Sequence, residues 1–194
     1  MGRSDGIEDG VGDTEIGVEP SLYLVGAPGT KKDEIARALE ERFPNNLTYK
    51  TENLENTPYA LGSVADYRIE LKLALERSLE KPSGATLYTH SVLDNLAYLS
   101  FAISRYQMGT VGEETVQRAV LAWTLTGLIL TDSFKNDHVF LLQGKFDPED
   151  DYESAELQII LQMILDQYQV NYSIIDVDDD PVEKIAETLG TYLD

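Results

Sequence analysis

Residues 21–33 limit the fold of this chain more narrowly than any other segment. A short apolar run, Leu22–Val25, leads into a turn with two glycines and a proline, and apolar residues at helical spacing follow over 34–43. An apolar strand that passes through a glycine-rich turn into a helix is the building unit of a parallel sheet covered by helices. The sequence therefore predicts an α/β domain that begins with this unit.

The rest of the chain repeats the alternation of short apolar runs and longer amphipathic segments. Strands are expected at 22–25, 47–51, 85–89, 138–142 and 172–177. Helices are expected at 34–43, 64–79, 91–106, 113–131, 154–168 and 182–193. Helix 113–131 is almost wholly apolar after its first residues, so we expect it to be buried. The pattern predicts one three-layer α/β/α domain over residues 20–194, with a mostly parallel five-stranded sheet.

Residues 1–19 differ from this domain because they combine glycines with acidic residues, which predicts a solvated N-terminal arm. The whole chain of 194 residues has 35 acidic and 15 basic side chains, a net charge of −20. Such a surface repels nucleic acid and anionic membranes, so we expect no direct binding to either. A solvated acidic surface, adaptation to high salt and mimicry of DNA toward a basic partner all fit this charge.

Other features of the composition exclude several kinds of site. No apolar run approaches the roughly 20 residues of a membrane-spanning helix, so we expect a cytoplasmic protein. The chain has no cysteine, which excludes disulfides and thiolate metal sites, and its two histidines lack the spacing of metal ligands. The sequence therefore predicts no metal site built from protein ligands alone.

The turn after the first strand follows the pattern of a phosphate-binding loop incompletely. In G-x-x-x-x-G-K-[ST], backbone N–H groups surround the phosphates, the lysine neutralises them and the hydroxyl holds Mg²⁺. The candidate binding residues are Gly26, Pro28, Gly29, Thr30, Lys31, Lys32 and Asp33. Lys31 replaces the second glycine and Asp33 replaces the hydroxyl, while Lys32 keeps the place of the phosphate lysine. A second interpretation of Thr30-x-x-Asp33 is a capping box that begins the following helix.

A second candidate site lies in the turn after strand 85–89. This turn and the glycine turn both follow carboxyl ends of parallel strands, where such sheets bind ligands, so we expect one shared crevice. His90 is a candidate base or phosphate ligand because imidazole titrates near neutral pH, and Asp94 is a candidate to face an acceptor. The alternatives are a histidine held by local hydrogen bonds and a carboxylate on the helix surface.

Four segments resemble the P-loop nucleoside and nucleotide kinases, above all the small AAA-type ATP-binding proteins related to nicotinamide ribonucleoside kinases. They are Ser21–Phe43, Ala85–Tyr98, Asp137–Leu142 and Tyr172–Leu189. The resemblance implies a P-loop kinase-like fold, ATP and Mg²⁺ as cofactors, and Lys32 on the phosphates. It also implies an aspartate at the end of strand 85–89, where this chain has Thr89. In the lid, 143–153, it implies arginines, where this chain has Lys145 among five acidic residues.

Two functional hypotheses remain. The first is a Mg·ATP-dependent nucleoside or nucleotide kinase, with Lys32, Asp94 and His90 as catalytic residues. The second is a kinase-fold protein of weak or lost activity, with or without a bound nucleotide, that acts on a protein partner or as a homo-oligomer. Its role would be structural, assembly or inhibitory, and a phage origin with a place in the virion would suit it. Departures in the loop, at the strand end and in the lid favour the second hypothesis.

Overall fold

The structure, a computed structural model, describes residues 21–50, 85–89, 91–106, 137–147 and 149–193, with individual positions between 113 and 134. Strands and helices alternate along these residues, as the hydrophobic pattern predicts. The strands are β1 (Ser21–Val25), β2 (Leu47–Lys50), β3 (Ala85–Tyr88), β4 (His138–Gln143) and β5 (Tyr172–Asp176). The helices are α1 (Lys32–Arg42), α3 (Val92–Tyr106), α5 (Tyr152–Gln167) and α6 (Pro181–Leu193).

The described strands form one five-stranded sheet in the order β2-β3-β1-β4-β5. Every neighbouring pair is parallel, so the sheet is wholly rather than mostly parallel. β1 lies at the centre, where Leu22 pairs with Leu87 on one side and with His138 on the other. Because all strands point the same way, the turns after β1 and β3 leave the same edge of the sheet.

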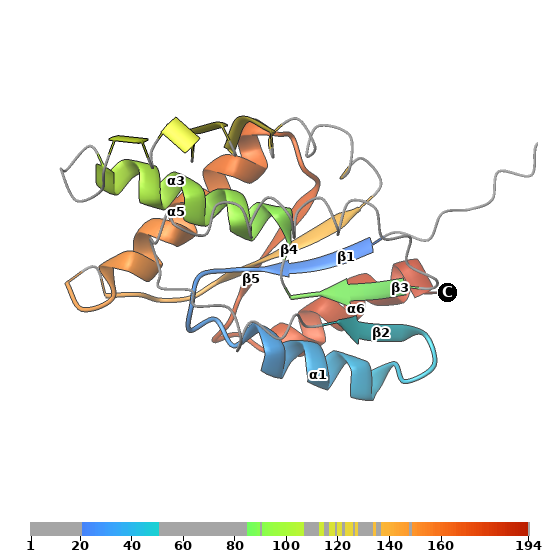
Figure 1. The fold of residues 1–194 in the computed structure, drawn as a ribbon. Coiled ribbons are helices and arrows are strands. Elements are labelled where there is room, and N and C mark those ends of the chain that lie inside the picture. The colour runs from blue at the N-terminus through green and yellow to red at the C-terminus, as the bar shows by residue number, and fades with distance from the viewer. Residues whose placement is uncertain are drawn as a thin grey trace, which may run out of the picture.

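Helices cover both faces of the sheet, which confirms the three-layer α/β/α arrangement (Figure 1). On one face α1 and α6 pack their apolar residues, such as Leu39 and Leu189, against Leu24 of β1. On the other face α3 and α5 pack their apolar residues, such as Leu96 and Leu161, against Val25 of β1. Strands buried on both faces are near-continuous apolar runs, and β4 is buried from His138 to Leu142. The fold is thus held by two cores with the sheet between them.

The prediction of a buried helix at 113–131 is wrong for several described positions. Residues there are helical, but Val120, Leu121 and Leu125 are 44%, 60% and 40% exposed. Trp123 faces the protein and donates a 2.9 Å hydrogen bond from its indole N–H to Ser100 of α3. An apolar composition therefore did not mean burial on all sides.

Three expectations fall on residues outside the described ranges: the arm 1–19, the helix 64–79 and the side chain of His90. None of the described helices is both long enough and apolar enough to cross a membrane.

Candidate functional site

The loop between β1 and α1 is held in shape by its glycines. A Cβ on Gly26 would lie 2.7 Å from the Thr30 hydroxyl oxygen and 3.1 Å from Leu142 Cβ, so a larger residue would displace the turn. Gly29 has φ of 87°, a region that side-chain-bearing residues rarely adopt. Both glycines are therefore required by the backbone path of the loop.

Lys31 also adopts a left-handed conformation, with φ of 56° and ψ of 33°. It stands where the phosphate-binding pattern has its second glycine, and it takes a backbone conformation that glycine adopts easily. For a residue with a Cβ this conformation costs about 1–2 kcal/mol. The replacement of glycine by lysine has thus strained the loop without forcing it out of the left-handed region.

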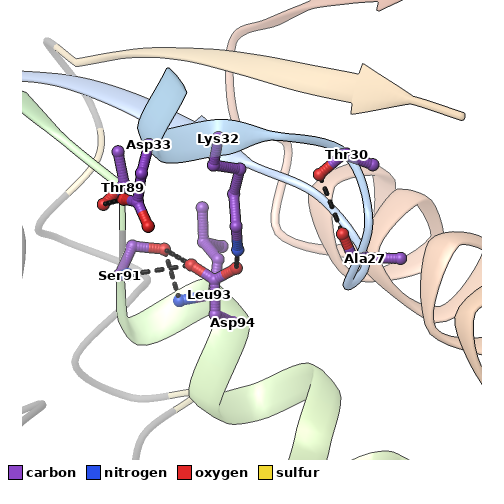
Figure 2. Close-up of polar contacts among 8 residues, drawn as sticks. All are labelled: Ala27, Thr30, Lys32, Asp33, Thr89, Ser91, Leu93 and Asp94. Carbon is purple, nitrogen blue, oxygen red and sulfur yellow. Dashed lines mark hydrogen bonds and ion pairs between the residues drawn. The ribbon is translucent and has the colours of Figure 1, made fainter. Parts of the chain in front are cut away.

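The capping box predicted from Thr30-x-x-Asp33 is wrong. The residue that caps α1 is Lys31, and no side-chain hydrogen bond caps the helix. The buried Thr30 hydroxyl instead turns back and donates a 2.8 Å hydrogen bond to the carbonyl oxygen of Ala27 (Figure 2). Because Thr30 closes the turn on itself, the first amides of α1 have no side-chain cap.

A cavity of about 410 Å³ lies against this loop. Its walls are the loop and the first turn of α1, residues 27–34, together with Tyr98 of α3. Lys32 and Asp33 both border it, so a cation and a carboxylate share its rim. Asp33 does not close the N-terminus of α1, and room remains there for a ligand.

Lys32 forms an ion pair with Asp94 of α3, with 3.1 Å between Nζ and Oδ1 (Figure 2). The side chain of Asp94 is only 2% exposed and that of Lys32 is 13% exposed. Asp94 Oδ2 also accepts hydrogen bonds from the Ser91 backbone N–H at 2.8 Å and from its hydroxyl at 3.0 Å. The candidate phosphate lysine is therefore held by a buried carboxylate that has two further donors.

Asp33 is linked to the ends of two strands. Its Oδ1 accepts a 2.9 Å hydrogen bond from the Thr89 hydroxyl, just after β3, and a 2.7 Å bond from the Tyr49 hydroxyl of β2. Asp33 is exposed, whereas Thr89 is fully buried. These contacts and the Lys32–Asp94 pair bring the two predicted turns into one crevice at the carboxyl edge of the sheet (Figure 2).

Lys145, the one lysine of the lid segment, pairs with an aspartate outside that segment. Lys145 Nζ lies 3.0 Å from Asp178 in the turn after β5, and this hydrogen bond raises the pKa of Lys145 above its usual value. Phe146 lies beside the loop, since a Cβ on Gly29 would be 3.6 Å from its ring. The lid therefore presents an aromatic ring to the loop, and its lysine is engaged by an aspartate.

Sequence reasoning missed three residues of this site: Tyr49, Ser91 and Tyr98. Ser91 had a usable signal, because Ser91-x-x-Asp94 is a capping-box pattern directly before an apolar helix. Its hydroxyl accepts a 3.1 Å hydrogen bond from the Leu93 backbone N–H, which completes that box. Tyr49 and Tyr98 carried no local signal, because their positions depend on how β2 and α3 pack around the loop.

No protein-family sequence model matches this chain, and no curated protein sequence matches it either. Solved structures do. One is a deoxyadenosine kinase from M. mycoides with bound dCTP, with a TM-score of 0.63, 14% identity, and coverage of 88% of this chain and 99% of that one. Another is the NadR protein in complex with NR, with a TM-score of 0.66 and 12% identity. That match covers 91% of this chain and 52% of NadR, so the chain spans about half of its length. At these identities the likeness establishes the fold, and the chain has the P-loop kinase-like α/β fold, with an all-parallel sheet in the order 2-3-1-4-5.

Proposed function

We propose that this chain binds a nucleotide through the loop 26–33, and that phosphoryl transfer there is slow or lost, so that binding rather than turnover is its function. The observation that carries the proposal is the loop itself. Gly29 and Lys31 have the positive φ values of a tight anion-binding turn, and the loop borders a cavity of about 410 Å³. The first amides of α1, which no side chain caps, favour phosphate at this point.

The contact between Lys32 and Asp94 sets the expected affinity. A phosphate that recruits Lys32 must compete with Asp94, which lies 3.1 Å away. Asp94 would keep its two hydrogen bonds from Ser91, so its carboxylate would not be stranded when Lys32 leaves. The competition therefore weakens binding without abolishing it, by about 1–3 kcal/mol, the usual worth of a charged hydrogen bond.

Slow transfer follows from the charges around the phosphates. Phosphoryl transfer depends on cations that stabilise the charge on the transferred group. Segment 143–153 contains no arginine and five acidic residues, and Lys145 is engaged by Asp178. In this fold Mg²⁺ bound with the nucleotide would supply charge neutralisation, and Asp33, held by a hydrogen bond from the Thr89 hydroxyl, offers a carboxylate oxygen of the kind that it prefers. This Mg²⁺ would not replace the arginines that segment 143–153 lacks.

A second candidate is a working nucleoside kinase. It is favoured by one observation, that the fold likeness spans 99% of the deoxyadenosine kinase chain. The acidic lid opposes this candidate, and a phosphotransfer assay separates it from the proposal.

The test is calorimetric titration of ATP and ADP, with Mg²⁺, into the full chain. We expect a dissociation constant of about 10–1000 µM, weakened at least about tenfold by Lys32→Ala, since one lost charge contact is worth about 1.4 kcal/mol or more. Arg37→Ala is the matched control, because it removes a cation from an exposed position of α1 that does not border the cavity. With nucleosides as acceptors we expect turnover far below the roughly 1–100 per second of kinases.

Two results would contradict the proposal. Turnover in the ordinary range would favour the working kinase. Binding that is undetectable up to millimolar nucleotide would leave a protein partner as the function. The acidic surface and the exposed Ile159 and Met163, one turn apart on α5, would then be the place to look for its contact.

A further inference from the structure

We propose that Asp33 and Thr89 are an exchanged pair, in which Asp33 binds a divalent cation beside the bound nucleotide and Thr89 positions Asp33, an inference that rests on the nucleotide binding proposed above. The phosphate-loop pattern has a hydroxyl at position 33, and the resemblance implies an aspartate at position 89. This chain has the carboxylate at 33 and the hydroxyl at 89. The two side chains touch, with 2.9 Å between Thr89 Oγ1 and Asp33 Oδ1 (Figure 2).

The contact between Asp33 and Thr89 links the two departures from the expected pattern. Considered separately along the sequence, each one removes a cation ligand from its usual place. Considered together, they leave the crevice with the same two donors, one carboxylate and one hydroxyl, and with the same charge. Either substitution alone would have produced two carboxylates or two hydroxyls. The two departures are therefore one coupled change, and not two independent losses.

The geometry presents the carboxylate to the cavity. Asp33 is exposed and borders the cavity, while the buried Thr89 hydroxyl and the Tyr49 hydroxyl both donate to its Oδ1. A carboxylate has about four lone-pair positions, so it can accept two hydroxyls and still bind a cation. Two donors from different strands fix its orientation. Asp33 is thus the direct ligand in this arrangement, and Thr89 positions it.

Asp33 also makes the loop dependent on the cation. The described residues contain no cluster of three or more acidic, histidine or cysteine side chains able to hold a metal, so the remaining ligands would be phosphate oxygens and water. Mg²⁺ commonly binds in this way, through one or two carboxylates and substrate phosphates. Without the cation, the Asp33 carboxylate faces the phosphates and repels them. Nucleotide binding should therefore be weak in the absence of a divalent cation.

The variant Asp33→Asn separates these effects. It keeps the shape of the side chain but removes the charge, so it should improve ADP binding without metal and abolish the gain that the cation brings. Glu41→Gln is the matched control, because it removes the same charge from an exposed residue of the same helix that does not border the cavity. Asp33 is exposed, so the variant is not expected to unfold the chain.

The experiment is titration of ADP into the full chain, once in EDTA and once with Mn²⁺, with Mn²⁺ binding followed independently by electron paramagnetic resonance. We expect the cation to raise ADP affinity at least about tenfold in the natural chain and in Glu41→Gln, a difference of about 1.4 kcal/mol, and less than about threefold in Asp33→Asn. The bound Mn²⁺ signal should be lost only in Asp33→Asn.

The outcomes separate this inference from the proposed function. ADP binding with an equal gain from Mn²⁺ in the natural chain and in Asp33→Asn would overturn the cation site and leave nucleotide binding standing. No ADP binding by the natural chain in either buffer would overturn both. A further variant, Asp33→Ser with Thr89→Asp, puts the two groups back in the usual order. If circular dichroism shows that this double variant folds, Mn²⁺ should again raise its affinity for ADP. In Asp33→Ser alone, Mn²⁺ should not raise the affinity for ADP.

Discussion

The two helices that begin at the crevice start with the same sequence pattern but with different structures. Thr30-x-x-Asp33 spans the start of α1, and Ser91-x-x-Asp94 spans the start of α3. At α3 the pattern forms a closed capping box, in which Asp94 accepts from the Ser91 backbone N–H and the Ser91 hydroxyl accepts from the Leu93 backbone N–H. At α1 the threonine turns back to Ala27, and the aspartate reaches β2 and β3 instead.

The difference shows that a capping-box sequence forms its hydrogen bonds only where the backbone brings its first and last residues together. At α1 the left-handed Lys31 stands between Thr30 and the helix, so the cap position moves to a lysine. The same loop path leaves the first turn of α1 without a side-chain cap and beside a cavity. One aspartate is thus part of the scaffold, whereas the other is placed at the edge of a candidate binding site.

The largest expected effect tests this division between the two aspartates. Asp94→Ala removes the cap of α3 and leaves Lys32 without its buried partner, so we expect the free energy of unfolding to fall by about 3 kcal/mol. Asp33→Asn should cost less than about 1 kcal/mol, because Asp33 is exposed and the amide oxygen can still accept from the Thr89 hydroxyl. Urea unfolding of both variants provides the measurement. Equal losses would contradict the assignment of a scaffold role to Asp94 alone.

A third carboxylate, that of Asp137, lies at the opposite end of the sheet and can be compared with Asp33 and Asp94. Asp137 accepts a 3.0 Å hydrogen bond from the Ser21 backbone N–H, and burial raises its pKa from 3.8 to about 6. Because the folded-state pKa is the higher one, the protonated form stabilises the fold at low pH, and this contribution is lost as the pH rises through about 6.

The free energy of unfolding of Asp137→Asn should therefore rise, relative to that of the natural chain, as the pH increases from 4.5 to 7.5. We expect a relative gain of about 1 kcal/mol, reduced from the full pKa difference because the side chain is only half-buried. Denaturant unfolding of both proteins at the two pH values measures it. Since other titrating groups are common to both proteins, parallel pH profiles would show that Asp137 has no such role.

The smallest effect concerns the strained residue that separates the two helix starts. Lys31→Gly relieves the left-handed strain, but it also adds freedom to the unfolded chain, so we expect a net gain of about 0.5 kcal/mol. Lys31→Ala removes the same side chain and keeps the strain, which makes it the control. A loss of stability in the glycine variant, with none in the alanine variant, would be inconsistent with strain at this position.

Much of the fold was predictable from the sequence because it depends on local periodicity. Alternating apolar runs and amphipathic segments predicted the nine described elements to within about two residues, and also the layers they form. The error at 113–131 arose from composition, since apolar residues there lie on an exposed face as well as on the packed one.

What the sequence by itself determined was the order of strands and helices, the position of the loop and the edge of the sheet at which it lies. What only the tertiary structure decided was the partner of each polar group: Thr89 for Asp33 at a separation of 56 residues, and Asp94 for Lys32 at 62. A local pattern specifies hydrogen bonds within a turn or two. The contacts that link Asp33 to Thr89 and Lys32 to Asp94 exist only because parallel strands bring distant turns to one edge.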